Sequence, residues 1–238
     1  MSSSLHNLTG DIARLSDGRI FGKVRAIQGI LVEIGGVQKF LSVGDRCTLI
    51  GRRDERVACE VVGFRDDRAL AMPFGALDGI GLGSAVEVGE SNSVAYPDNA
   101  WLGRVIDAFG EPLDGKGPID RGRVGYPVKQ TPPPAHDRGR VDGKIDLGVK
   151  SLNAFVTCCR GQRMGVFSAS GVGKSILLSM MARYSQADVI VIGLVGERGR
   201  EVKEFVEEDL GPEGLARSVL VVATSDESPL MRRQAAYM

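Results

Sequence analysis

The segment Ser168–Ser175, with the sequence SASGVGKS, constrains this chain more than any other feature. The residues before it, Met164–Ser168, predict a buried strand, and those after it, Ser175–Tyr184, predict a helix. The phosphate-binding motif GxxxxGKS/T requires a glycine-bearing loop in this setting, because its backbone amides turn toward phosphate groups at a helix N-terminus. The sequence therefore predicts a site for a nucleoside triphosphate, ATP, beside a parallel sheet.

Each residue type in this loop has an expected task. We expect Lys174 to reach the β- and γ-phosphates and the Ser175 hydroxyl to ligate Mg²⁺. The first motif position holds Ser168 where the motif has glycine, which weakens the match at the strand-to-loop turn. The expected nucleotide-binding residues are Ser168, Ala169, Ser170, Gly171, Val172, Gly173, Lys174, Ser175 and Ile176.

Two carboxylates follow other predicted strands. Glu197 comes after Asp188–Val195, at the sheet edge where ligands of open parallel sheets bind, and there it can polarise an attacking water. The alternative, weighed equally from spacing alone, is a charged first turn of a helix. Asp226 follows the predicted strand Ser218–Ala223 and could hold a metal as a Walker B residue, but a turn before the helix N-cap Ser228 is favoured.

The chain divides into three regions by pattern. Residues 19–88 contain short β-type runs separated by turn residues, and about five such strands predict a small closed barrel. Residues 96–144 are rich in glycine and proline, so no regular element is expected, and either a flexible linker or a long ordered loop fits. The predicted barrel strands are Arg19–Ile27, Ile30–Ile34, Val57–Phe64, Ala69–Met72 and Ala85–Val88.

From Ile145 onward, apolar strands alternate with amphipathic helices, which predicts a parallel sheet covered on both faces. A helix is expected near Glu201–Leu210, ended by Gly211 and Pro212. The helix that Ser228 begins runs to Met238 without a cap, and only three strands are visible. We therefore expect the polypeptide to end inside a domain.

Composition excludes some classes of function. The 238 residues carry thirty basic and thirty acidic side chains, so a general electrostatic attraction to nucleic acid is not expected. The longest apolar run, Val189–Val195, is far too short to span a bilayer. Four cysteines without CxxC spacing, and only two histidines, argue against a zinc site and favour reduced thiols.

Several of these segments together resemble the catalytic ATPases of bacterial flagellar and type III protein export, which are similar to the catalytic subunit of rotary ATP synthases. The resemblance covers nearly the whole chain. It rests on SASGVGKS at 168–175, ADVIVIGLVGERGREVKEF at 187–205, VVATSDESPLMRRQAAY at 221–237, GRVIDAFGEPLDGKGPI at 103–119 and GQRMGVF at 161–167.

The resemblance implies an α/β fold: an incomplete RecA-like P-loop core over residues 94–238, preceded by a β-barrel over 19–93. Residues 1–18 would be a partner-docking or a disordered segment. It also implies that Glu197 activates water and that Arg198 supports the phosphate site, so Lys174, Glu197 and Arg198 are the expected catalytic residues. Asp226 becomes a poor metal-ligand candidate, because the family's Walker B strand, arginine finger and adenine pocket lie beyond Met238.

The resemblance further implies an ATP hydrolase that couples turnover to the export of flagellar proteins. The GVGKS and GERGREV segments favour an export ATPase over a rotary-synthase catalytic subunit, which typically has GVGKT and GERTREG. Flagellar rather than virulence-type secretion is favoured, with both kept open. A non-catalytic regulatory subunit is disfavoured by Glu197, and a nucleic-acid translocase by the neutral charge.

Several partners follow from the same resemblance. These are a homo-hexameric ring, a regulatory stator-like partner at the N-terminus, the membrane export gate and chaperone–substrate complexes, with no nucleic acid. The location implied is cytoplasmic, at the inner face of the flagellar basal body. We expect the chain as it stands to bind nucleotide weakly and to hydrolyse ATP poorly.

Overall fold

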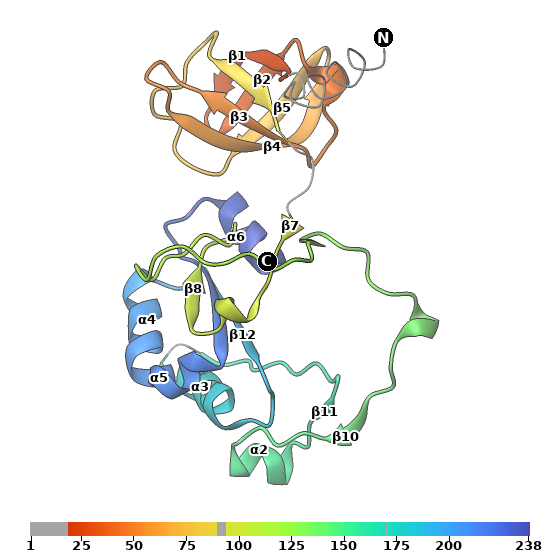
Figure 1. Cartoon of the computed structure of the whole chain (residues 1–238), viewed down its shortest axis with the longest axis vertical. Coiled ribbons are helices and arrows are strands. Elements are labelled where there is room, and N and C mark those ends of the chain that lie inside the picture. The colour runs from red at the N-terminus through yellow and green to blue at the C-terminus, as the bar shows by residue number, and fades with distance from the viewer. Residues whose placement is uncertain (1–18, 90–93, 170) are drawn as a thin grey trace, which may run out of the picture. The chain divides into compact units, whose positions relative to one another are not determined.

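The computed structural model describes residues 19–89, 94–169 and 171–238. These residues form two compact units, one ending at residue 89 and one beginning at residue 94 (Figure 1). The docking segment expected over residues 1–18 lies outside the described residues. No helix among the described residues is both long enough and apolar enough to cross a bilayer.

The first unit is a closed barrel of six strands in the order β1-β2-β5-β4-β3-β6, with every neighbouring pair antiparallel. The predicted barrel is therefore confirmed, with one strand more than expected. The strands are β1 (Phe21–Gln28), β2 (Leu31–Gly35), β3 (Arg46–Ile50), β4 (Arg56–Arg65), β5 (Arg68–Pro73) and β6 (Ala85–Val88), and a 3₁₀ turn η1 (Gln38–Phe40) follows β2.

The missed strand is β3, with the sequence RCTLI. Its Cys47 and Leu49 are buried while Arg46, Thr48 and Ile50 are less buried, which is the alternation of a half-buried strand. The signal is weak in the sequence because the strand is short and carries both cysteine and arginine. Its place is decided by pairing with β4 and β6, which closes the barrel.

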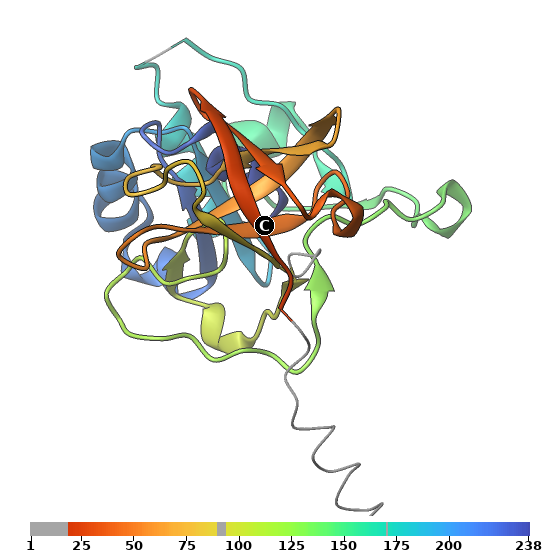
Figure 2. The ribbon, with the colours of Figure 1, turned by 90° about the horizontal axis from the view of Figure 1, so that it is seen from above.

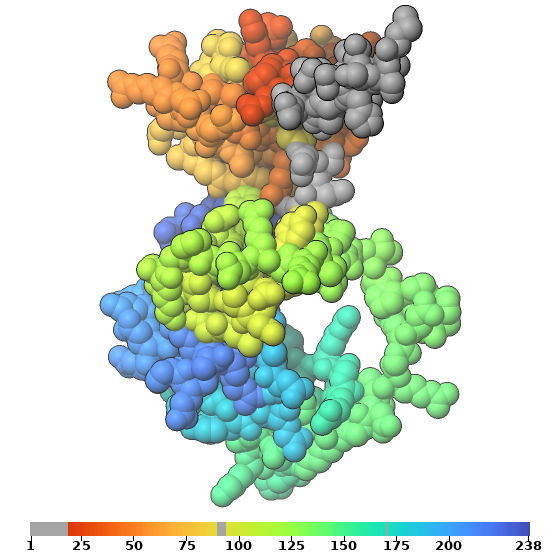
Figure 3. Space-filling view, in the orientation of Figure 1, coloured from red at the N-terminus to blue at the C-terminus, as the bar shows by residue number. Residues whose placement is uncertain are grey.

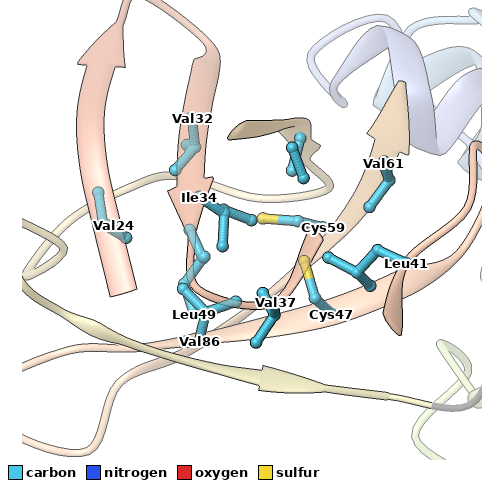
Figure 4. Close-up of a cluster of buried hydrophobic side chains, with 12 residues drawn as sticks. Val24, Val32, Ile34, Val37, Leu41, Cys47, Leu49, Cys59, Val61 and Val86 are labelled. Atoms are coloured by element: carbon cyan, nitrogen blue, oxygen red, sulfur yellow. The ribbon is translucent and has the colours of Figure 1, made fainter. Parts of the chain in front are cut away.

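Apolar side chains from all the strands fill the barrel interior (Figure 4). Burying each large aliphatic side chain contributes about 1.5–3 kcal/mol to folding. Cys47 lies opposite Cys59 on neighbouring strands, and their hydrogen bond together with burial raises the pKa of the Cys59 thiol. The buried cluster contains Val24, Val32, Ile34, Val37, Leu41, Cys47, Leu49, Cys59, Val61, Ala69, Ala71 and Val86.

The second unit is built on a parallel sheet in the order β12-β13-β8. Strands β12 (Ile190–Val195) and β13 (Ser218–Ala223) confirm two predictions, the first starting two residues later than expected. Strand β8 (Arg104–Ile106) contradicts the prediction that no regular element runs through residues 96–144. The Arg104 guanidinium donates two hydrogen bonds to the Asp114 carboxylate, at 2.7 and 2.9 Å, and this holds the glycine- and proline-rich hairpin against the strand.

Helices α3, α4 and α5 and the π-helical turn η4 cover one face of this sheet, where Phe205 and Leu210 pack against Leu220 and Val222. Helix α6 contacts β12 and β13. The helices are α2 (Lys150–Phe155), α3 (Lys174–Tyr184), α4 (Gly199–Glu204), η4 (Phe205–Leu210), α5 (Gly211–Ala216) and α6 (Pro229–Tyr237). The shorter elements are β7 (Val94–Ala95), η2 (Asn99–Trp101), β9 (Tyr126–Pro127), η3 (Ala135–Asp137), β10 (Asp142–Lys144) and β11 (Cys159–Arg160).

The helix boundaries confirm most of the local predictions. Helix α3 begins one residue before the expected Ser175, and the Ser228 hydroxyl caps α6 by accepting a hydrogen bond from the Met231 amide. The predicted end of the helix at Leu210, before Gly211 and Pro212, is confirmed, because Gly211 is the C-cap of η4. Gly211 adopts a positive φ of 65° and Pro212 lies in the first turn of α5, so the two residues redirect the helical chain into a new segment.

The strand predicted for Met164–Ser168 is absent, so this prediction is wrong. A strand exists through hydrogen bonds to a neighbour, and β12 pairs only with β13 among the described residues. Phe167 is consequently 96% exposed. An apolar run indicates that a segment can be buried, but the run does not supply a partner strand.

Candidate functional site

The glycines of the phosphate-binding loop adopt conformations that other residues rarely tolerate. Gly171 has a φ of 77° and Gly173 a φ of 95°, and Gly173 is the N-cap of α3. Apart from the adjoining residues of the chain, no described atom lies within 4 Å of the place where a side chain would begin at either glycine. The loop is therefore open where a phosphate group would approach the backbone, so its residues fit a nucleotide's phosphates.

Lys174 and Glu197 come together at this loop from two different elements. Lys174 is the first residue of α3, and Glu197 follows the carboxyl end of β12. The Lys174 Nζ lies 3.9 Å from Glu197 Oε1, with side chains 44% and 39% exposed. The Ser225 amide donates to the Glu197 carbonyl at 2.9 Å, which fixes the backbone that carries the carboxylate.

Arg198 occupies a different position from its neighbour. Its guanidinium lies 3.4 Å from the Glu201 carboxylate on the first turn of α4, and its side chain is exposed. Arg198 thus contacts its own helix, whereas Glu197 contacts Lys174.

A cavity of about 590 Å³ joins these groups, a size within the range of small-molecule sites. Lys174, Ser175, Ser185, Glu197 and Glu201 contribute the polar side chains of its lining. Glu201 was interpreted from the sequence only as a helix-turn residue. The signal that could have placed it here is its spacing of one helical turn from Glu197. The apolar lining comes from Ile145, Leu147, Met164, Val166, Leu178, Met181, Ala182, Ala187, Ile190, Val191, Ile192, Leu194, Val202 and Phe205.

The other predicted loop residues are found mostly at the surface. Ser168, Ala169, Val172 and Ile176 are exposed, and Ser170 lies outside the described residues. Their exposure leaves the loop accessible to a ligand from solvent.

The described residues hold no group of three histidine, cysteine or acidic side chains that could bind a metal ion by themselves. Ser175, which follows Lys174 in the phosphate-binding loop and lines the cavity, has a hydroxyl that could contribute one metal ligand. Asp226 lies in a turn outside the cavity lining, and a hydrogen bond from Thr224 lowers the pKa of its carboxyl. This position agrees with the turn interpretation of Asp226.

Comparisons with known proteins place both units in one family. Residues 24–88 match the beta-barrel domain of the ATP synthase alpha/beta family, and residues 148–238 match its nucleotide-binding domain. Together the two matches cover more than half of the chain.

Curated relatives match nearly the whole chain. A flagellum-specific ATP synthase of Caulobacter vibrioides is 53% identical over 98% of this chain and 53% of its own length. The flagellum-specific ATP synthase of Bacillus subtilis is 46% identical over 91% and 49% of the two chains. A type 3 secretion system ATPase of Xanthomonas euvesicatoria is 44% identical over 97% and 52%. The chain thus spans about half the length of the curated relatives it matches.

A solved structure gives the same result. The ATPase EscN, assembled with its central stalk EscO in the type III secretion system of enteropathogenic E. coli, superposes with a TM-score of 0.81 and 33% identity. The match covers 91% of this chain and 52% of EscN. From its barrel, its phosphate-binding loop and these matches, the chain belongs to the ATP synthase alpha/beta family, and the relatives that it matches include flagellum-specific ATP synthases and a type 3 secretion system ATPase.

Proposed function

We propose that this chain supplies the ATP-binding and hydrolysing residues of an ATPase that drives flagellar, type III protein export. The observation that carries the proposal is the 3.9 Å approach of Lys174 to Glu197 at the mouth of a ligand-sized cavity. Relatives at up to 53% identity are named flagellum-specific ATP synthases, which supports the export role.

The proposed chemistry assigns each group one task. Lys174 neutralises charge on the β- and γ-phosphates, and the loop amides beside Gly171 and Gly173 bind phosphate oxygens. Mg²⁺ neutralises the developing charge when it is bound, and the Ser175 hydroxyl is the residue that would hold it. Arg198 supports the phosphate site after leaving Glu201.

Glu197 orients the attacking water and accepts its proton. The Lys174 ammonium that contacts Glu197 has a second partner once phosphate enters, because the γ-phosphate competes with the carboxylate for the same cation. Triphosphate binding therefore releases Glu197 to face water. This order of events follows from the exposed, 3.9 Å ion pair, which is weak enough to exchange.

The chain alone is proposed to bind nucleotide more readily than it hydrolyses it. Hydrolysis benefits when water is excluded and the charged groups are enclosed, and here both the loop and Glu197 are open to solvent. A homo-hexameric ring, an N-terminal regulatory partner, and an export gate with chaperone–substrate complexes at the cytoplasmic side of the membrane complete the proposed system. The assembled state of EscN supports the ring.

Nucleotide binding and phosphate release by wild type and Lys174→Ala test the proposal. We expect wild type to bind a fluorescent ATP analogue, and Lys174→Ala to weaken binding at least about tenfold because a charge-assisted phosphate contact is lost. Lys150→Ala, an exposed lysine that begins α2, is the matched control and should bind like wild type. Equal affinity of wild type and Lys174→Ala would refute the nucleotide site.

Virulence-type secretion is the second candidate. The Xanthomonas secretion ATPase is as similar to this chain, at 44%, as the Salmonella flagellar relative is, at 43%. Replacing the corresponding segment of each relative's gene with this chain's coding sequence separates the two. Recovery of motility without recovery of virulence secretion supports the flagellar assignment, and the reverse result contradicts it.

A further inference from the structure

Positive charge on this neutral chain is concentrated in one segment. Residues 121–141, which we call the basic arm, carry five basic side chains and one acidic side chain, Asp137. The basic side chains are Arg121, Arg123, Lys129, Arg138 and Arg140.

Within the arm, residues 128–141 are held at both ends and stand away from the rest of the second unit (Figure 3), whereas the Gly122 amide donates a hydrogen bond to the Tyr96 carbonyl. At one end β9 pairs with β7, and at the other β10 pairs with β11. Every arm residue is exposed except Gly122 and Val128, which are half-buried. Pro132–Pro134 stiffen its middle because proline restricts φ, so Arg138 and Arg140 are presented to solvent.

Negative charge is concentrated in a second segment of the same unit. Residues 201–213, which we call the acidic face, carry six acidic side chains and one basic side chain, Lys203. Phe205 and Leu210 of this segment pack into the core, and Glu201 lines the cavity beside Lys174. The other charged members that are exposed are Lys203, Glu204, Glu207, Glu208 and Glu213. The acidic side chains are Glu201, Glu204, Glu207, Glu208, Asp209 and Glu213.

The two charged surfaces lie on opposite sides of the unit. Figures 1 and 2 show the arm on the right and α4 on the left in two perpendicular views. None of the ion pairs among the described residues joins the arm to the acidic face. Glu204, Glu208 and Glu213 form no ion pair with any other described residue, so their charge is available to a partner.

We infer that the basic arm of one copy of this chain docks on the acidic face of a second copy. Surfaces that are complementary in charge and lie on opposite sides of one subunit generate head-to-tail contacts, which close into rings or continue as filaments. The inference rests on the proposed ring and identifies the surfaces that would form it. Because the charges are exposed, the association is sensitive to salt.

Charge reversal on each surface tests this inference by sedimentation velocity over a range of concentrations. The arm variant is Arg123→Glu, Arg138→Glu, Arg140→Glu, and the face variant is Glu204→Lys, Glu208→Lys, Glu213→Lys. Each alone should weaken self-association at least about tenfold, because like charges then meet across the contact. The matched control reverses three exposed basic residues of the barrel, Lys39, Arg52 and Arg53, and should associate like wild type.

Mixing the two variants is the decisive measurement. In the mixture, the arm of the arm variant is acidic and meets the basic face of the face variant. The arm of the face variant is still basic and meets the acidic face of the arm variant. Both contacts are complementary in charge, so the mixture should regain association. A chain carrying all six substitutions should regain it as well. Raising the ionic strength from about 0.02 to 0.5 M should dissociate every one of these assemblies.

Three results would overturn the inference. These are a wild type that stays monomeric at about 0.1 mM and low salt, reversal variants that associate like wild type, and a mixture that does not recover. The arm variant could instead lose binding to a polyanion such as heparin while its self-association stays unchanged. That result would assign the arm to another partner and would also reject docking on a second copy of the chain. Binding of the fluorescent ATP analogue, measured on the same samples, shows separately whether the nucleotide site is intact.

Discussion

The two units of this chain differ in how completely they bury their own apolar side chains. The barrel closes its sheet, so each of its six strands has two neighbours, and its interior cluster is almost fully buried. The nucleotide-binding unit has an open sheet of three strands with β12 at one edge. Phe167 and Val191, which are 96% and 69% exposed, lie in this second unit.

This difference indicates where each unit draws its stability. Antiparallel strands joined by short turns can close on themselves, which removes the unpaired edges. A parallel sheet needs coverage on both faces, and here one face of β12 retains exposed valines. The unit with the more exposed apolar side chains also carries Lys174 and Glu197. The residues that bind nucleotide therefore lie in the less completely packed unit.

The largest expected effect separates chemistry from packing. Glu197→Gln removes the proton acceptor, so hydrolysis should fall about 10²- to 10⁴-fold while triphosphate binding persists. Single-turnover hydrolysis, with protein in excess over ATP, measures this. Glu111→Gln, an exposed carboxylate in the loop after β8, is the control and should hydrolyse like wild type. Unchanged hydrolysis by Glu197→Gln would remove this residue from the mechanism.

The next effect concerns the barrel alone. Leu49→Ala leaves a cavity in the closed core, and the free energy of unfolding of the barrel should fall by about 2–5 kcal/mol. Trp101 is the only tryptophan and lies in the second unit. Chemical denaturation should therefore shift the β-type circular dichroism transition and leave the Trp101 fluorescence transition in place. Leu82→Ala, at a side chain 74% exposed, should change neither transition.

A smaller effect should appear in acid in the nucleotide-binding unit. Hydrogen bonds from Arg104, and then from the Lys116 and Val105 amides, hold the pKa of Asp114 well below its usual range. The stabilisation is therefore fully present above the unfolded pKa of about 3.9 and is lost as pH falls toward the lowered folded pKa. Asp114→Asn should lower the denaturation midpoint followed by Trp101 fluorescence at pH 7. It should also flatten the decline of this midpoint below about pH 4.

Asp120→Asn, an exposed carboxylate in the same loop, is the matched control for this measurement. An Asp114→Asn protein with the acid profile of wild type would show that the Arg104–Asp114 pair does not hold β8 in the sheet.

The smallest effect compares the same substitution in both units. Val191→Thr, on the exposed face of β12, should change the free energy of unfolding by less than about 0.5 kcal/mol. Val32→Thr, fully buried in the barrel, places a hydroxyl in an apolar core and should cost about 1–3 kcal/mol. Denaturation of the two variants measures the contrast. A large cost at Val191 would mean that a partner covers this face in solution.

Sequence patterns predicted much of this fold because they depend on local physics. The strands β12 and β13, the helix α3 and the cap at Ser228 each follow from periodicity or capping within one short segment. Strand β8 and the unpaired segment Met164–Ser168 were not predictable in this way. Whether these residues pair is decided by segments far along the chain, such as β13 for β8.

The candidate site divides along the same line. The sequence by itself determined the loop chemistry, because Gly171, Gly173 and Lys174 have their roles through backbone freedom and charge at a helix start. Only the tertiary structure decided that Glu197 meets Lys174, that Arg198 turns to its own helix, and that Glu201 lines the cavity. The reason is that side chains on separate elements converge only when the sheet and its covering helices pack together.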